Sequence, residues 1–572
     1  MGQASVLLDQ IRTAQRRRTA PLVLEADLTA PLVEGVPHGP LAAATAFRKP
    51  TLRETITALR RAGRDPRVRG LVAKLGGTQA MSLPRAEELR EAVAAFRADG
   101  KQAIAWAETY GEFGPGNGAY YLATGFDQIW LQPSGDVGLT GVALAQYFLA
   151  GAFEQANAKV QLSQRYEYKN AANVFTEREF TDAHREAAGR VVTSAANQLV
   201  RGIAEARGLP VADVRGLVDR APLAAADALD AHLVDRLGYR DEVYAAARAI
   251  TGDDAQLLFL SKYGSPRVRR AGARAVGAGR DAIGLVHVTG GIHLGHSDGT
   301  PPLSPRSAGA DTVTAALRDA VRSPDVRAIV LRVDSGGGSY AASDAIWRAV
   351  GRARAAGKTV ITSMGQAAAS GGYYVAMGAH AIVAEPTTLT GSIGVLGGKV
   401  VLDRVLGRAG ISRDAITEGE HALMSSALFE YDEADRQRLE EWLDRVYADF
   451  TSKVAESRRL DPERVHELAR GRVWTGADAH ERGLVDELGG LAHALEVAKR
   501  HAGIPASADI DVRVFPHVTP VSRLLPAKSS EEPGAAAARL RVSGWGVFAG
   551  LTARLGLPAY GPLSLSGDWR LC

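Results

Sequence analysis

The sequence contains one cysteine, Cys572, at the end of its 572 residues. A single thiol excludes an intramolecular disulfide framework and any metal site built from several cysteines. No stretch approaches the roughly 18 consecutive apolar residues of a membrane-spanning helix. The segment from Met1 to Arg18 interrupts its apolar residues with polar ones, unlike the core of a signal peptide. We therefore expect neither a signal peptide nor a transmembrane span.

An excess of one charge is also lacking. The chain has 68 Lys and Arg residues against 64 Asp and Glu residues, for a net charge of +4, and the two signs are interleaved. The run Arg16-Arg17-Arg18 is short and carries no interleaved aromatics, which is typical of a solvated helix end. This balance argues against a nucleic-acid partner. With 46% hydrophobic residues, the chain can bury large cores and is too long for one compact domain.

An internal repeat divides the chain into two similar halves. Three segments of the first half return in the second in the same order: 66–72 as 324–330, 133–142 as 386–395, and 226–235 as 477–486. Such a repeat determines the domain organisation before any secondary structure is assigned. We predict a first repeat over 1–261, a linker over 262–281, a second repeat over 282–513, and a tail over 514–572 that is rich in Pro, Ser and Ala with an apolar end.

Apolar strands alternate with amphipathic helices in each half. In the second half the periodicity predicts strands over 283–288, 328–333 and 359–362, and helices over 312–321, 341–356, 371–377 and 433–457. The last of these helices has a first-half counterpart over 184–206. Strands that alternate with crossover helices predict an α/β fold in which a largely parallel sheet is covered on both faces.

The second repeat carries a candidate nucleophile. It reads Ser370-Gly371-Gly372-Tyr373, whereas the first repeat has Asn117 in place of the serine. Ser370 is expected where a strand gives way to a helix, a turn that exposes its hydroxyl and directs the Gly371 amide at a reacting carbonyl. The turn Gly336-Gly337-Gly338 ends a neighbouring strand and offers a second amide for an oxyanion hole. Taken alone, a glycine-rich turn after a strand is more often ordinary turn chemistry, and it is the combination of these features with their spacing that indicates a catalytic site.

A serine nucleophile needs a base to take its proton. His380 lies about three helical turns beyond Ser370 and would point away from it. A lysine can serve instead when burial lowers its pKa enough to populate the neutral amine. A histidine and a lysine from elsewhere in the chain therefore both remain open as the base.

Four motifs occur in order: Ser335-Gly336-Gly337-Gly338-Ser339, Ala369-Ser370-Gly371-Gly372-Tyr373, Leu389-Thr390-Gly391-Ser392-Ile393-Gly394 and Gly471-Arg472-Val473-Trp474-Thr475-Gly476. Through these four motifs the chain resembles the signal peptide peptidase A family of serine proteases, peptidase family S49, in its long bacterial form. The resemblance covers about residues 20 to 510. The resemblance implies tandem duplicated crotonase/ClpP-like domains and a Ser-Lys dyad that needs no metal or organic cofactor. It assigns the base to Lys169, in Tyr168-Lys169-Asn170-Ala171, and the lysine-orienting hydroxyl to Ser392.

The two halves have lost complementary parts of this site. The first half has lost both serines, since Asn117 and Leu139 stand at the matching positions. The second half has lost the lysine, because none occurs over 411–429, where the counterpart of Lys169 belongs. His421 lies in that stretch and is the strongest competing base. One composite active site built across both halves explains both losses at once.

Two features depart from the family's pattern. Gly336 replaces the usual proline before the paired glycines. Either Gly337 or Gly338 can then supply the second oxyanion amide, and we favour Gly338. The family's anchoring transmembrane segment is missing from this sequence. We expect a bacterial protein that is cytoplasmic or peripherally associated with the plasma membrane.

The expected function is that of a serine endopeptidase. By resemblance, its substrates are cleaved signal peptides or other short, apolar, unfolded peptides, and its assembly is a homotetramer. One rival is a crotonase-like acyl-CoA enzyme, which shares the fold and the paired oxyanion amides, but we find no convincing pair of carboxylates near Ser370. The other rival is a non-catalytic scaffold for membrane or partner binding, and the intact serine pair argues against it.

Overall fold

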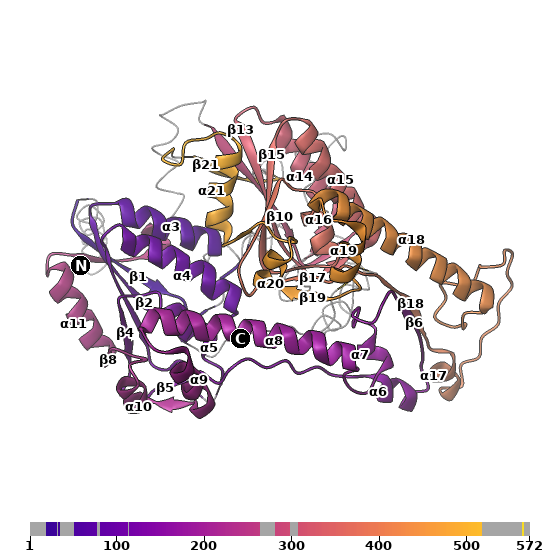
Figure 1. The fold of residues 1–572 in the computed structure, drawn as a ribbon, viewed down its shortest axis with the longest axis horizontal. Helices are drawn as coiled ribbons and strands as arrows, with labels where there is room; N and C mark the ends of the chain where they lie inside the picture. The colour runs from indigo at the N-terminus through magenta and orange to yellow at the C-terminus, as the bar shows by residue number, and fades with distance from the viewer. Residues whose placement is uncertain are drawn as a thin grey trace, which may run out of the picture.

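The computed structural model describes residues 19–30, 32–34, 51–76, 81–112, 114–263, 281–297, 307–508, 510–516 and 563–564. Two twisted sheets organise these residues, each flanked by helices (Figure 1). Within the described part of the chain, no helix is both long enough and apolar enough to span a membrane.

The first sheet consists of six parallel strands in the order β8-β4-β3-β2-β1-β9. Helix α11 covers one face over a small apolar core, and α3, α4, α5 and α8 cover the other over a larger one. The strands are β1 Leu22–Asp27, β2 Val68–Lys74, β3 Gln102–Ala107, β4 Gln128–Leu131, β8 Arg236–Leu237 and β9 Gln256–Phe259. The helices are α3 Leu52–Arg64, α4 Leu83–Ala98, α5 Asn117–Ala123, α8 Asp182–Arg207 and α11 Arg240–Thr251, followed by α12 Leu260–Tyr263.

The second sheet repeats this plan around a central path β19-β17-β15-β13-β10-β21, with β16 and β20 beside β15. Its strands are β10 Ala282–Thr289, β13 Val326–Ser335, β15 Thr359–Ala369, β16 Ala381–Ala384, β17 Leu389–Gly391, β19 Val473–Thr475, β20 Glu487–Leu488 and β21 Asp511–Phe515. Helix α21 Leu491–His501 covers one face. The other face carries α14 Ala310–Arg322, α15 Tyr340–Ala355, α16 Gly371–Ala376 and α18 Glu433–Arg458. All pairings but β17–β19 are parallel, so the predicted tandem α/β fold is confirmed.

The predicted helices and two of the predicted strands agree with the structure to within two residues at each end, but the third strand is much longer than predicted. The pattern predicted a strand over 359–362, whereas β15 continues to Ala369. The extension forms because Ala367, Ala368 and Ala369 pair with β17, which a pattern broken by Gly365 and Gln366 does not reveal. Ser370 consequently follows a strand directly.

The predicted domain limits stay a prediction. Helix α12 takes in the first two residues of the expected linker, and residues 264–280 lie outside the described part, as does the stretch over 518–538 in the tail. The first sheet's described strands end at Phe259 and the second sheet's begin at Ala282.

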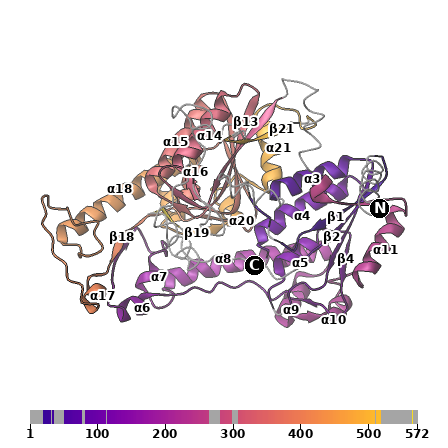
Figure 2. The same ribbon diagram turned by 180° about the vertical axis from the view of Figure 1, so that it is seen from behind.

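Two elements of the first half, a long helix and a short strand, join it to the second half (Figures 1 and 2). Helix α8 of the first half runs beneath the second, where Oγ of Ser194 lies 2.7 Å from Oγ1 of Thr475 on β19. Strand β6 (Lys159–Gln164) pairs antiparallel with β18 (Leu396–Val401) of the other half. The chain that follows β6 is thereby carried to the carboxyl end of the second sheet, the edge at which parallel α/β sheets bind ligands.

The remaining short elements lie at the edges of the two halves. A small sheet in the order β12-β11-β14-β22 borders the second half, and β5 pairs with β7 in the first. These strands are β5 Asp136–Val137, β7 Leu223–Ala224, β11 Gly291–His293, β12 Ser307–Gly309, β14 Gly337–Gly338 and β22 Leu563–Ser564. The short helices are α6 Ala150–Gln155, α7 Asn173–Thr176, α9 Val211–Arg220, α10 Ala225–Asp230, α17 Asp403–Arg408, α19 Pro462–Leu468 and α20 Gly476–Glu481.

Candidate active site

Ser370 occupies a strained turn between β15 and α16. Its φ of 54° and ψ of −115° lie outside the regions that L-residues ordinarily adopt. Such a conformation costs on the order of 1–3 kcal/mol and persists where the surrounding structure enforces it, often at functional sites. Here the Ser370 amide donates to the carbonyl of Gly391 at 2.8 Å, and the Ser370 carbonyl accepts from the amide of Tyr374 at 2.9 Å. The side chain is fully buried.

Lys169 meets Ser370 from the other half of the chain. Its Nζ lies 2.7 Å from Oγ of Ser370, 3.0 Å from Oγ of Ser392 and 3.1 Å from the Ser392 carbonyl oxygen. The side chain is 1% exposed. Burial lowers its pKa to about 7, with no carboxylate among the causes to offset it. Near neutral pH a large fraction of this amine is therefore neutral and can accept a proton from the serine.

The segment that carries Lys169 is held by the second half. The Arg165 amide donates to the carbonyl of Val395 at 2.9 Å, and the Tyr168 amide to that of Arg470 at 3.2 Å. Gly471, with φ of 85°, passes so close that a Cβ there would lie 2.4 Å from the Lys169 amide nitrogen. A glycine is thus required at this position of the fourth motif, because any side chain would displace the lysine.

Ser392 stands at a second strained position, between β17 and β18, with φ of 50°. Its amide donates to the carbonyl of Arg472 at 2.7 Å. Two residues before Ser392, Oγ1 of Thr390 donates to the carbonyl of Ala368 at 2.8 Å, and this bond holds β17 against the end of β15. The third motif therefore fixes the Ser392 hydroxyl beside the lysine and beside the serine turn.

Two backbone amides lie side by side next to Ser370. Gly371 opens α16, so its N–H has no partner within the helix. A Cβ on Gly371 would lie 3.0 Å from the amide nitrogen of Gly338, which places the two amides together. The Gly337 amide instead donates to Oγ of Ser335 at 3.1 Å. This geometry supports the choice of Gly338 over Gly337 as the second oxyanion donor.

The alternative bases have other partners. Nδ1 of His380 accepts from the amide of Val360, near the beginning of β15 and away from Ser370. Nδ1 of His421 lies 2.8 Å from Oδ1 of Asp435 at the first turn of α18. Among the described residues, neither ring makes a hydrogen bond with Ser370, whose Oγ is bonded by Lys169.

The matching position of the first half holds a structural residue. Nδ2 of Asn117 donates to the carbonyl of Gly141 at 2.8 Å, and Oδ1 accepts from the Gly141 amide at 3.3 Å. Asn117 and Leu139 are both fully buried. The Asn117 side chain thus makes two hydrogen bonds to Gly141, one donated and one accepted, and so closes a loop. A serine hydroxyl at this position is too short to make both bonds, which accounts for the asparagine in the first half.

A short segment of the tail lies against the two candidate oxyanion amides, and the sequence did not predict this. Leu563–Ser564 pairs antiparallel with Gly337–Gly338, and the Leu563 side chain is fully buried. The carbonyl oxygen of Leu563 and the amide nitrogen of Gly371 both fall within 2.6 Å of where a Cβ on Gly337 would stand. The apolar character of the segment over 545–565 was the available signal, but it does not identify β14 as the contact.

Sequence comparison places both repeats in one family. The sequence model described as Peptidase family S49 matches residues 95–252 and 352–505. The chain is 30% identical over 457 residues to "Serine protease SPPA, chloroplastic" of Arabidopsis thaliana, covering 79% of this chain and 65% of that protein. It is 32% identical over 464 residues to "Protease 4" of Salmonella typhi, covering 78% and 72%. The chain thus spans just under two thirds of the length of the Arabidopsis protein.

A solved structure also shows a partial likeness. A mutant of ClpP1 from Listeria monocytogenes aligns with 37% of this chain and 94% of its own, at 16% identity and a TM-score of 0.24.

Proposed function

The chain belongs to peptidase family S49, and we propose that it is a serine endopeptidase whose nucleophile is Ser370 and whose base is Lys169. One observation carries the proposal. A fully buried lysine with a lowered pKa lies 2.7 Å from the hydroxyl of a strained serine, and the two residues come from different halves. Serine is a weak nucleophile until a base accepts its proton, and this arrangement supplies one.

The proposed reaction proceeds in two stages. Neutral Lys169 accepts the proton of Ser370 Oγ as that oxygen attacks the peptide carbonyl carbon, and the oxyanion accepts hydrogen bonds from the amides of Gly338 and Gly371. The Lys169 ammonium then protonates the departing amine nitrogen, the C–N bond breaks, and an ester to Ser370 remains. Water next gives a proton to Lys169 and attacks the ester, which releases the acid and returns the proton to Ser370. Ser392 holds Nζ in place throughout.

The proposed substrates are short, apolar, unfolded peptides, among them cleaved signal peptides. The pairing of Leu563–Ser564 with β14 supports an extended backbone in the site, since a strand added to an open edge is a common mode of peptide binding. The complete burial of Leu563 supports an apolar side chain next to the reacting carbonyl. A homo-oligomer, by family resemblance a tetramer, and a peripheral membrane contact belong to the same proposal.

The direct test compares two substrate classes on the purified protein. We expect an unfolded apolar peptide to yield products with new amino termini, detected by mass spectrometry, and an acyl-CoA thioester to remain intact. Peptide bonds and thioesters both need an oxyanion hole, but an amine must be protonated as it leaves whereas a thiolate leaves unprotonated, so peptide cleavage is the outcome that requires the Lys169 ammonium. Thioester turnover without peptide cleavage would instead favour a crotonase-like enzyme. If neither substrate were turned over, the result would favour a non-catalytic scaffold.

Removal of the tail is expected to increase activity on short peptides. The tail segment and a substrate strand compete for the same edge of β14. If the edge is free in about a tenth of the molecules, KM of the full chain is raised about tenfold over that of a chain ending at residue 516. Steady-state kinetics on a short peptide would show this as a lower KM with kcat unchanged. In the full chain, Leu563→Glu should act in the same direction, and an unchanged KM in both variants would contradict the competition.

A further inference from the structure

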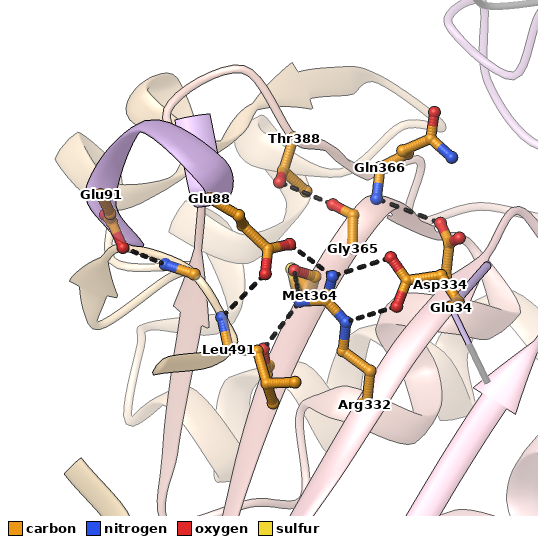
Figure 3. Close-up of polar contacts among 12 residues, drawn as sticks. Glu34, Glu88, Glu91, Arg332, Asp334, Met364, Gly365, Gln366, Thr388 and Leu491 are labelled. Carbon is orange, nitrogen blue, oxygen red and sulfur yellow. Dashed lines mark hydrogen bonds and ion pairs between the residues drawn. The ribbon is translucent and has the colours of Figure 1, made fainter. Parts of the chain in front are cut away.

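A buried ionic cluster lies between the two halves, centred on Arg332 of β13 (Figure 3). The side chain is fully buried. Its Nε and Nη2 bind the two carboxylate oxygens of Glu34 at 3.2 and 3.0 Å, and Nη2 also bonds Glu88. Its Nη1 donates to Oγ of Ser363 at 3.0 Å and to the carbonyl of Met364 at 2.9 Å. Each guanidinium nitrogen is therefore engaged.

These partners belong to three separate parts of the protein. Glu34 and Glu88 come from the first half, Glu88 from α4, whereas Ser363 and Met364 lie on β15 of the second half. Glu88 is also fastened to α21, because its Oε2 accepts from the Leu491 amide at 3.1 Å. Arg332 consequently ties the first half to β15, the strand that ends at the proposed nucleophile.

The next charged residue along β13 shapes β15 just ahead of Ser370. Oδ1 of Asp334 accepts from the amides of Gln366 and Ala367 at 3.1 and 3.3 Å, where the β13–β15 register shifts. Gly365 has no room for a side chain there, since its Cβ would lie 2.9 Å from Asp334. Oγ1 of Thr388 donates to the Gly365 carbonyl at 2.8 Å. The path of β15 between Met364 and Ser370 is thus set by side-chain contacts as well as by strand pairing.

Stability alone is a poor explanation for so many buried ionisable groups. Burial raises the pKa of Glu88 and of Asp334, which Arg332 opposes, and it raises the pKa of Glu87, which bonds Thr387, to about 8. Glu385 is buried in the same region, and burial and the neighbouring glutamates raise its pKa well above the ordinary value. Buried ion pairs are often no more stabilising than apolar residues of the same volume, and their best-attested use is to specify one geometry.

We infer that Arg332 is a positioning residue, which sets Ser370 at bonding distance from Lys169 by holding β15 against Glu34 and Glu88 of the first half. The inference rests on the proposed Ser370–Lys169 dyad. A composite site requires that the two halves meet in one register, and displacement of a reacting group by about 1 Å can cost about 10²-fold in rate. Among the described residues, Arg332 makes no hydrogen bond to Ser370, Ser392 or Lys169, so its effect is exerted through β15.

The decisive variant removes all three charges at once, Arg332→Met with Glu34→Gln and Glu88→Gln. Arg332→Met alone would leave two buried carboxylates without their cation and is expected to unfold. We expect the triple variant to keep the parent Tm and KM, to lose about 10²-fold in kcat, and to shift the pH at which activity is half-maximal, because the Lys169 environment changes. A purely structural cluster would move neither kcat nor the pH profile of the folded protein.

Arg332→Lys provides the second arm, whether or not the triple variant folds. A lysine keeps the charge beside Glu34 and Glu88 but cannot also reach Ser363 and Met364 in the forked geometry of arginine. We expect kcat about tenfold lower with KM unchanged. As the matched control, Arg60→Met removes the exposed pair between Arg60 of α3 and Glu496 of α21, which also joins the halves, and kcat should not change.

Wild-type kcat in a folded triple variant, or in Arg332→Lys, would overturn the inference. A wrong assignment of the Ser370–Lys169 dyad would give a different result. In that case the parent protein fails to cleave peptides, or Ser370→Ala cleaves them at the parent rate, whatever the state of Arg332.

Discussion

Replacement of Ser370 by alanine is expected to lower kcat for peptide cleavage by about 10⁴-fold or more while the protein stays folded. The variant lacks the atom that attacks the carbonyl carbon, so no ester intermediate forms. Folding should survive, because the strained turn is held by backbone bonds to Gly391 and Tyr374 that alanine retains. The measurement is kcat on an unfolded apolar peptide, together with the mass added by a serine-directed acylating probe. Probe labelling at another residue, with cleavage retained, would disprove the assignment.

The repeat supplies a matched control for this result. In the Ser370→Ala background, Asn117→Ser puts a hydroxyl at the equivalent turn of the first half. We expect neither cleavage nor probe labelling to return, since Lys169, the proposed base, is hydrogen-bonded to the second-half serines. Recovery of activity would mean that either half can form the site, which the composite arrangement excludes.

The proximity of Lys169 and Ser370 could be predicted because the two copies differ at the positions of the proposed dyad. Asn117 in one half and the missing lysine in the other indicated one site shared between them, and family motifs then named Lys169. Periodicity also predicted the crossover helices, whose apolar stripes are determined by local sequence. The distance between Lys169 and Ser370 was beyond prediction, because it depends on how β6 pairs with β18 across the halves.

What the sequence missed depends on long-range contacts. Arg332 interrupts an otherwise apolar strand over 328–333, a signal of a buried charge, yet nothing local identifies Glu34 and Glu88 as its partners. The extension of β15 to Ala369 follows from its pairing with β17. The contact of Leu563 with Gly338 joins segments far apart in the chain. Patterns of neighbouring residues report on local structure and on burial, but they do not specify which distant segments meet.

Strained residues concentrate around the proposed dyad. Ser370, Ser392 and Arg470 all have φ between 50° and 54°, and each is next to a glycine or a strand end of the four motifs. The Ser370 and Ser392 amides donate to Gly391 and Arg472, so each strained turn is fixed by the neighbouring one. The motifs are therefore a single interlocked unit, and Lys169 enters it through the space that Gly471 leaves open.

Peptide cleavage is expected to depend on pH through Lys169. Burial lowers the pKa of this amine from 10.5 to about 7, and the reactive form is the neutral one. The neutral fraction grows as pH rises, so kcat/KM should climb about tenfold per pH unit below 7 and level off above it. At pH 5 the expected value is about a hundredth of the plateau. Initial rates measured from pH 5 to 9 would give the apparent pKa directly, and a flat profile would contradict a lysine base.

Substitution of the lysine should remove both the activity and its pH dependence. Lys169→Met keeps the apolar stem but has no proton acceptor, and Lys169→Arg stays charged at every accessible pH. We expect kcat to fall about 10³-fold or more in both, with no recovery at pH 9. His380→Ala and His421→Ala serve as controls and should keep the parent profile, because Val360 and Asp435 engage these rings. If Lys169→Met retained activity that His421→Ala abolished, the base would be His421 and the second half would hold the whole site.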